Sequence, residues 1–149
     1  MKNKMKYFIP RLLILIFVIA LIVLISAVFK NQESTSRVCF GEKCLNIEIA
    51  DNYEERRQGL MFREKLDENS GMLFIFESSG EYDFWIQNTL IPLDIIWINE
   101  DYKIVDIQKA VPCMDVACRS YIPNGEARYV LEVNSGFAEE NGINIGDEV

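Results

Sequence analysis

The stretch from Gly71 to Ile98 constrains the fold of this 149-residue chain more than any other segment. It concentrates Trp, Phe, Ile and Leu around a small polar group formed by Gln87, Asn88, Thr89 and Asp94. Aromatic and β-branched residues at this density are typical of strands in a small β-rich core. Polar groups inside such a core cost free energy unless they are hydrogen-bonded or take part in binding or catalysis. The segment therefore predicts a β core and marks a candidate site.

An apolar run over residues 12–29 contains neither a charged residue nor Pro. As a helix it is about 27 Å long, close to the roughly 30 Å of membrane hydrocarbon. The basic residues before it predict that residues 1–11 stay in the cytoplasm and that 12–29 form a transmembrane signal anchor. A cleaved signal peptide is the alternative, although its apolar region is normally shorter, about 7–15 residues.

The polar residues 30–37 are expected to tether an extracytoplasmic domain, residues 38–149, close to the membrane. Five of the 15 Lys and Arg lie within the first 30 residues, whereas all 23 Asp and Glu follow them. The formal net charge of the residues beyond position 30 is therefore −13. Such a surface repels phosphate backbones, which excludes nucleic acid as an expected partner.

Short apolar segments separated by turn residues predict a mainly β fold with a minor α component, either a compact small barrel or a two-sheet roll. The expected strands are 37–40, 44–50, 72–76, 82–87, 93–98, 102–109 and 127–133. Asp51 is expected to cap a short helix that ends near Gly59, and a second helix is expected over 135–141. With the anchor, the predicted architecture is one transmembrane helix followed by this domain.

Four cysteines form two pairs in the sequence, Cys39 with Cys44 and Cys113 with Cys118. Outside the cytoplasm an even count favours disulfides, and four cysteines allow three connectivities. A hairpin turn containing Gly41 makes the local pairing plausible for the first pair. A zinc site built from all four cysteines is the alternative, but structural zinc sites usually use shorter spacings, so no metal or cofactor is expected.

Several motifs together resemble the DUF192 family and cover nearly all of residues 45–149. They are Glu55–Arg63, Gly71–Phe74, Phe84–Trp85, Asn88–Thr89, Ile91–Asp94, Pro112–Cys113 with Cys118, Tyr129–Val133, and Gly142 with Gly146–Asp147. The resemblance implies a small exported or membrane-linked, mainly β domain without an established activity. The family commonly has Lys where this chain has Gln87. This implies that a cation able to meet an anionic ligand is missing here.

The candidate ligand-binding residues are Trp85, Asn88, Thr89, Asp94 and Trp97, because aromatic faces beside amide and hydroxyl groups suit neutral polar ligands. The alternative is structural: tryptophan is ordinary core material, and Asp94 can accept hydrogen bonds from the backbone of residues 88–90 and fix the bend at Pro92. A carboxyl buried on an apolar strand can also be tuned as a general base.

The chain contains no His, which excludes Ser/His/Asp and Cys/His catalysis. We therefore expect a membrane-anchored, non-catalytic envelope module that binds a small polar ligand or a protein partner. Two alternatives stay open. One is an enzyme that uses Asp94 with Asn88 or Thr89, and the other is a thiol redox protein that uses Cys113 and Cys118, although their spacing is not Cys-x-x-Cys.

Overall fold

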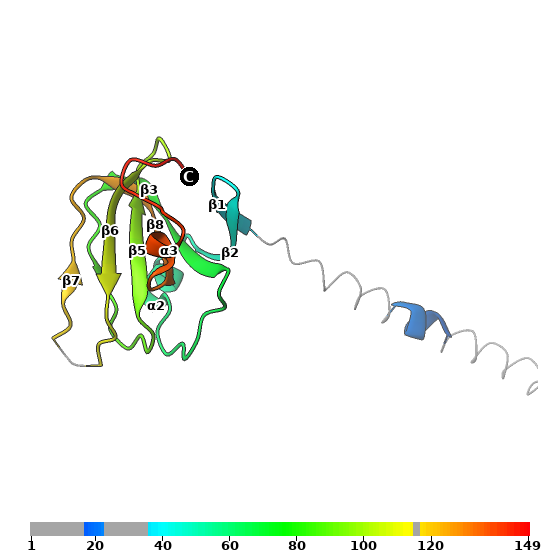
Figure 1. Ribbon diagram of the computed structural model, residues 1–149. Coiled ribbons are helices and arrows are strands. Elements are labelled where there is room, and N and C mark those ends of the chain that lie inside the picture. The colour runs from blue at the N-terminus through cyan, green and yellow to red at the C-terminus, as the bar shows by residue number, and fades with distance from the viewer. Residues whose placement is uncertain (1–16, 23–35, 115–116) are drawn as a thin grey trace, which may run out of the picture. The chain divides into compact units, whose positions relative to one another are not determined.

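The computed structural model describes residues 17–22, 36–114 and 117–149 (Figure 1). The chain divides into two units, residues 1–34 and 35–149. In the first unit, residues 17–22 are helical. Most of the predicted anchor and tether, and all of residues 1–11, lie outside the described residues. Within the described ranges, no helix has the combined length and apolar character that a membrane span requires.

The second unit is built on one open six-stranded sheet with the order β1-β2-β3-β8-β5-β6 (Figure 1). Strands β2 and β3 pair in parallel, and every other neighbouring pair is antiparallel. The strands are β1 (Ser36–Phe40), β2 (Lys43–Ala50), β3 (Ser70–Gly80), β5 (Leu93–Ile98), β6 (Ile104–Ala110) and β8 (Ala127–Asn134). A separate two-stranded sheet pairs β4 (Phe84–Trp85) with β7 (Ser120–Tyr121). The mainly β prediction is confirmed, but the described strands do not close into a barrel.

The large sheet has a hydrophobic cluster on each face. Alternate residues of β5 separate cleanly: Leu93, Ile95 and Trp97 join one cluster, and Ile96 and Ile98 join the other. The first cluster includes Leu60 and residues of β4 and β7, and the second includes Phe137 and Ala138 of α3 (Phe137–Glu140). Because neighbouring side chains of a strand point to opposite faces, each polar residue on β5 or β8 lies beside one of the two hydrophobic clusters.

Helix α2 (Tyr53–Gln58) begins one residue later than the sequence predicts. Its N-cap is Asn52, whose side chain accepts a hydrogen bond from the Glu55 backbone N–H at 3.1 Å. The Glu55 carboxylate in turn accepts from the Asp51 N–H at 3.2 Å. The N-cap is thus Asn52 and not Asp51, and Gly59, which has a positive φ of 48°, is the C-cap that follows Gln58.

Each cysteine is bridged to the one five positions away in the sequence, in the disulfides Cys39–Cys44 and Cys113–Cys118. Their Cα–Cα distances are 4.0 and 5.8 Å. The first bridges two residues that face each other across the β1–β2 hairpin. This arrangement excludes the alternative of one zinc ion held by all four thiolates. More broadly, the described part of the chain contains no group of three or more acidic or Cys side chains placed to hold a metal ion.

Candidate functional site

A cavity of about 300 Å³ opens between α2, the β4 region and the central strands of the sheet. Its size lies at the lower end of the range for small-molecule sites. It combines an apolar and aromatic wall with charged and polar side chains. The lining residues used below are Arg56, Phe74, Phe76, Phe84, Trp85, Gln87, Thr89 and Glu132.

Glu132 reaches this cavity from the middle of the sheet. It lies on β8, directly between Met72 of β3 and Ile95 of β5 in the strand register. Only 4% of its surface is exposed, and none of the described residues donates a hydrogen bond to its carboxyl group. Burial without a partner penalises the charged form and raises the pKa of Glu132 from 4.5 to about 8. At neutral pH this carboxyl group is therefore mostly protonated.

Arg56 supplies a fixed cation to the same cavity from α2. Its Nη1 donates to the backbone carbonyl groups of Asp51 and Ile75, the latter at 2.8 Å. Its guanidinium group lies 5.3 Å from the ring centroid of Phe76. Among the described residues, none accepts a hydrogen bond from its Nε or Nη2. Arg56 is thus held in place by the protein while two kinds of donor remain for a ligand.

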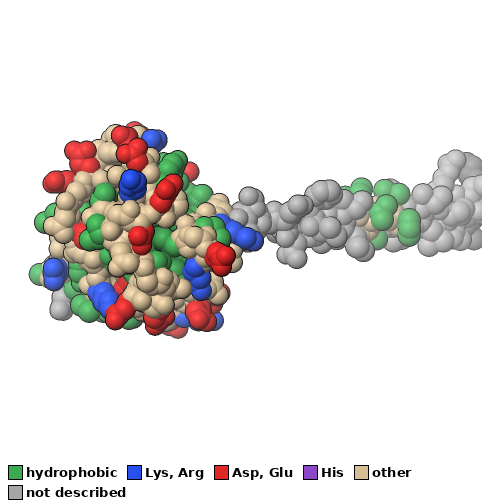
Figure 2. All heavy atoms as spheres, turned by 45° about the horizontal axis from the view of Figure 1, so that its top comes forward, with side chains coloured by type: hydrophobic (Ala, Val, Ile, Leu, Met, Phe, Trp, Pro, Cys, Tyr) green, Lys and Arg blue, Asp and Glu red, His purple; other side chains and the backbone are tan. Residues whose placement is uncertain are grey.

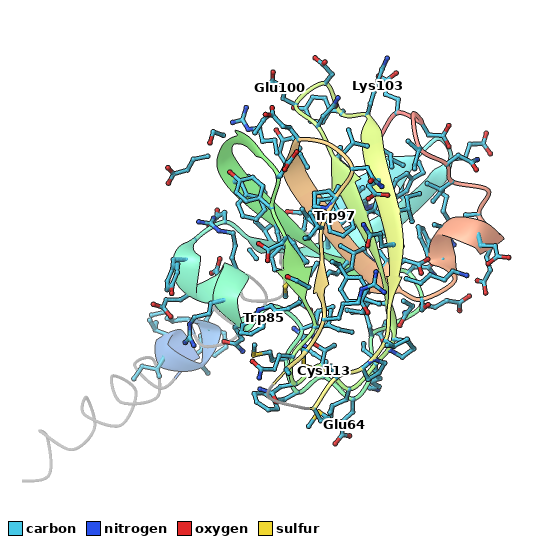
Figure 3. All side chains as sticks on the ribbon, turned by 90° about the vertical axis from the view of Figure 1, so that its left-hand side faces the viewer. Glu64, Trp85, Trp97, Glu100, Lys103 and Cys113 are labelled. Carbon is cyan, nitrogen blue, oxygen red and sulfur yellow. A yellow bond between two sulfur atoms is a disulfide. The ribbon has the colours of Figure 1, made fainter. Side chains whose placement is uncertain are left out.

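The wall of the cavity is formed largely by aromatic rings. Phe74 and Phe84 meet edge to face at 4.9 Å, and Phe76 stacks on Tyr82 at 3.6 Å. Trp85 is 53% exposed, which is unusual for an indole and places an aromatic face where a ligand can reach it. Figure 3 shows Trp85 near α2 and Trp97 among the strands of the sheet. The wall therefore offers flat apolar surface beside the Arg56 guanidinium group and the Glu132 carboxyl group.

A tight turn positions Gln87 and Thr89 at the cavity. The Thr89 N–H donates to the Ile86 carbonyl at 3.2 Å, and Asn88 adopts a positive φ of 58°. The backbone of Asn88 is held on both sides: its N–H donates to the Cys113 carbonyl at 2.9 Å, and its carbonyl accepts from the Phe62 N–H at 2.8 Å. Cys113, which is bridged to Cys118, thus supports one wall of the cavity.

The structure separates the five predicted ligand-binding residues. Trp85 and Thr89 line the cavity, whereas Asn88, Asp94 and Trp97 do not. Trp97 is 0% exposed, and its Nε1 donates to the Tyr82 carbonyl at 2.9 Å, so it belongs to the core. Asn88 serves the turn. The predicted cluster is therefore split because one part of the segment forms a turn and the other a buried strand.

The structure contradicts two expectations about Asp94, its role as a base and its hydrogen-bond donors. It is 0% exposed, so it is not placed to act as a base on a substrate. Its hydrogen-bond donors are the backbone N–H groups of Gly136 at 3.1 Å and Ala138 at 3.0 Å, and not those of residues 88–90. The reason is side-chain alternation on β5, which turns Asp94 toward α3 and away from the cavity. Asp94 fixes the start of α3 to the sheet.

Glu132 was missed by sequence reasoning, although a signal was present. It is the one charged residue within the apolar run Val130–Val133, and β8 is buried at all four of these positions. The argument that singled out Asp94, a carboxylate set in an apolar strand, applies equally to Glu132. Only the strand order shows that Glu132, and not Asp94, faces a cavity.

Comparison with known proteins gives a consistent family. Residues 36–149 match the DUF192 family, described as an uncharacterized ACR. A UPF0127 protein of Thermococcus sibiricus is 30% identical over 105 residues, 69% of this chain and 64% of that protein. A UPF0127 protein of Pyrococcus horikoshii is 28% identical over 105 residues, 69% of this chain and 84% of that protein. The chain thus spans slightly under two thirds of the first of these relatives.

Two crystal structures share the fold. One is a protein of unknown function from Novosphingobium aromaticivorans, 36% identical with a TM-score of 0.66, covering 70% of this chain and 74% of that one. The other is titled a putative transcription regulator from Sinorhizobium meliloti, 31% identical with a TM-score of 0.66, covering 79% of this chain and 95% of that one.

Proposed function

The chain belongs to the DUF192 family, and from that premise we propose that its 36–149 domain is a non-catalytic binding module for a small polar molecule with an apolar or flat body. The observation that carries the proposal is the buried carboxyl group of Glu132 at an aromatic-walled cavity, without a hydrogen-bond donor among the described residues. A carboxyl group with so little access to water and no protein donor costs free energy, and a bound ligand that pairs with it lowers that cost.

The rest of the cavity supports the same function. Small-molecule sites are mostly apolar with a few convergent polar groups, and this cavity has that composition. Arg56 is already fixed by backbone carbonyl groups and Phe76, so binding an anionic or polar group requires little further ordering of its side chain.

Ligand screening by protein NMR tests the proposal. We expect members of a library of polar metabolites to shift the indole signal of Trp85 in the wild-type chain, and the backbone amide signals of Gln87 and Thr89 in the wild type and the variants. The Trp85→Ala variant should weaken that binding about tenfold, since a stacking surface of this kind contributes about 1 kcal/mol or more. Ile122→Ala is the matched control, because Ile122 is similarly exposed but does not line the cavity. A library without a single binder, or equal losses in both variants, would contradict the proposal.

We place this module outside the cytoplasm, held at the membrane by residues 12–29. The support is the uncharged apolar run and the basic residues that precede it. Two disulfides in the domain are consistent with an oxidising compartment. Accessibility of an introduced cysteine at position 42 to a membrane-impermeant thiol reagent in intact cells would test this. Labelling only after lysis would contradict it.

Acid–base catalysis is the second candidate function, and it depends on Glu132 in the role first assigned to Asp94. A carboxyl group with a pKa of about 8 inside a cavity is suited to donate a proton near neutral pH. Thr89 lines the same cavity and could orient a substrate. Chemical change of a bound ligand in the wild type, lost in Glu132→Gln while binding persists, would favour this function over binding alone.

Nucleic-acid binding is not part of the proposal, although one structural relative is titled a putative transcription regulator. Beyond residue 30, this chain has 23 acidic residues against ten Lys and Arg. On the face drawn in Figure 2, basic side chains lie singly among acidic ones. A duplex requires clustered Lys and Arg on one face to neutralise its phosphates.

A further inference from the structure

We infer that the ligand is a zwitterion of the amino-acid class, with its ammonium group against the Glu132 carboxylate, its own carboxylate at Arg56 and an apolar side chain on the aromatic wall. The inference rests on the proposed binding function and gives it a chemical class. Three separate features of the cavity carry it: a buried acid, a fixed cation with unused donors, and a wall of rings.

Glu132 specifies the ammonium end. Its carboxyl group lies between two apolar neighbours in the sheet register, Met72 and Ile95, so the strands themselves provide no counter-charge. A cation entering the cavity would meet the Glu132 carboxyl group there together with the rings of Phe74, Phe84 and Trp85. Aromatic faces beside a carboxylate form a favourable setting for an ammonium group, because both attract positive charge.

Arg56 specifies the carboxylate end. The guanidinium fork matches a carboxylate in geometry, and its Nη1 already anchors it to the Ile75 carbonyl. Its neighbour Arg57 is less available, since it forms an exposed pair with Glu54 at 3.4 Å. A ligand with both charges would pair with Glu132 and Arg56 together, which a purely cationic or purely anionic ligand cannot do.

The other charged and titratable groups at the cavity leave this assignment unchanged. They are Tyr53 and Arg57 from α2, and Asp83 just before β4. The Asp83 side chain is exposed to water, and its carboxylate accepts a hydrogen bond from the Ser120 hydroxyl at 2.6 Å. Asp83 therefore already has partners without a ligand. Glu132 is the buried acid of the cavity, and it is the group whose ionisation a ligand changes most.

Binding has a measurable proton balance. In the free protein near pH 7 the Glu132 carboxyl group holds its proton, because burial raises its pKa to about 8. An ammonium group beside it favours the carboxylate, so the proton leaves to solvent as the ligand enters. The protonated acid and the ammonium ligand thus become an ion pair and one free proton. Release should approach one proton per ligand at pH 6.5–7.

Calorimetry of the full chain with L-phenylalanine, in two buffers of different ionisation enthalpy, measures this release. Two analogues separate the ends of the ligand: N-acetyl-L-phenylalanine lacks the ammonium group, and L-phenylalanine amide lacks the carboxylate. We expect each analogue to bind at least tenfold more weakly than L-phenylalanine, with no proton release for the N-acetyl compound.

Matched variants complete the test. Glu132→Gln should abolish both the proton release and the preference for L-phenylalanine over its N-acetyl analogue, whereas Glu126→Gln, an exposed acid outside the cavity, should change neither. Arg56→Gln should abolish the preference over the amide. Equal binding of the N-acetyl compound without proton release would overturn the inference and leave the binding function standing. If L-phenylalanine and L-leucine do not bind while other metabolites do, the inference is also wrong; if no metabolite binds, the proposed function fails as well.

Discussion

Glu132→Gln should stabilise the protein in a pH-dependent manner, because the substitution keeps the shape of the side chain and removes its ionisation. In the folded state burial raises the pKa of Glu132 from 4.5 to about 8. Between these values the native state binds more protons than the unfolded state does, so this group lowers stability as pH rises. Its contribution is fully favourable below about pH 4.5, is lost as pH rises toward 8, and levels off above that.

The magnitude follows from the same interval. One pKa unit corresponds to about 1.4 kcal/mol, so the full loss between pH 4.5 and pH 8 is about 5 kcal/mol. At pH 7 the loss is about 3 kcal/mol. Glutamine does not ionise, and the variant is therefore expected to match the wild type near pH 4.5 and to exceed its stability by about 3 kcal/mol at pH 7. Such a gain is a large fraction of the total stability of a small domain.

Urea unfolding of the full chain in a mild nonionic detergent measures this difference. The fluorescence of the buried Trp97 reports loss of the core. The free energy of unfolding is compared for wild type and Glu132→Gln at several values between pH 4.5 and pH 9. Glu126→Gln corrects for the loss of one exposed negative charge. A difference that stays constant across this range would refute the reasoning, since it would mean that Glu132 ionises alike in the folded and unfolded states.

Three further variants test the structural assignments. Asp94→Ala should cost about 3 kcal/mol of unfolding free energy, because the buried N–H group of Ala138 and the partly buried N–H group of Gly136 lose their acceptor. Lys109→Ala, which removes an exposed ion pair between β6 and α3, should change little, and equal effects would contradict the assignment. Replacing Cys113 and Cys118 by Ser should lower the free energy of unfolding by about 2 kcal/mol and alter the NMR signals of the 87–89 turn. Unchanged turn signals would show that the disulfide does not support the turn. Gly71→Ala should destabilise the sheet by about 2 kcal/mol, since a Cβ there would lie 2.8 Å from the Glu132 carbonyl oxygen; thermal unfolding that matches the wild type would rule out this close approach.

Local patterns explain most of what the sequence predicts correctly. The sequence predicts a strand over residues 93–98, and β5 has those bounds, because all of its residues except Asp94 are apolar and the chain turns on either side. The β1–β2 hairpin and its disulfide follow from a short turn between two strands. The sequence does not predict strand β7, in contrast, since two residues give no periodic signal and their pairing with β4 depends on the tertiary fold.

The sequence by itself determined the β-rich composition, both short helices, and the presence of costly carboxylates in apolar strands. The tertiary structure decided which carboxylate meets a cavity. Strand β8 inserts between β3 and β5, and this order places Glu132 on the face that carries α2. The same sheet turns Asp94 to the other face, where its partners Gly136 and Ala138 lie more than 40 residues away in the chain. Residue type and alternation are local properties, whereas strand order is set by the burial of both faces at once, and no single segment encodes it.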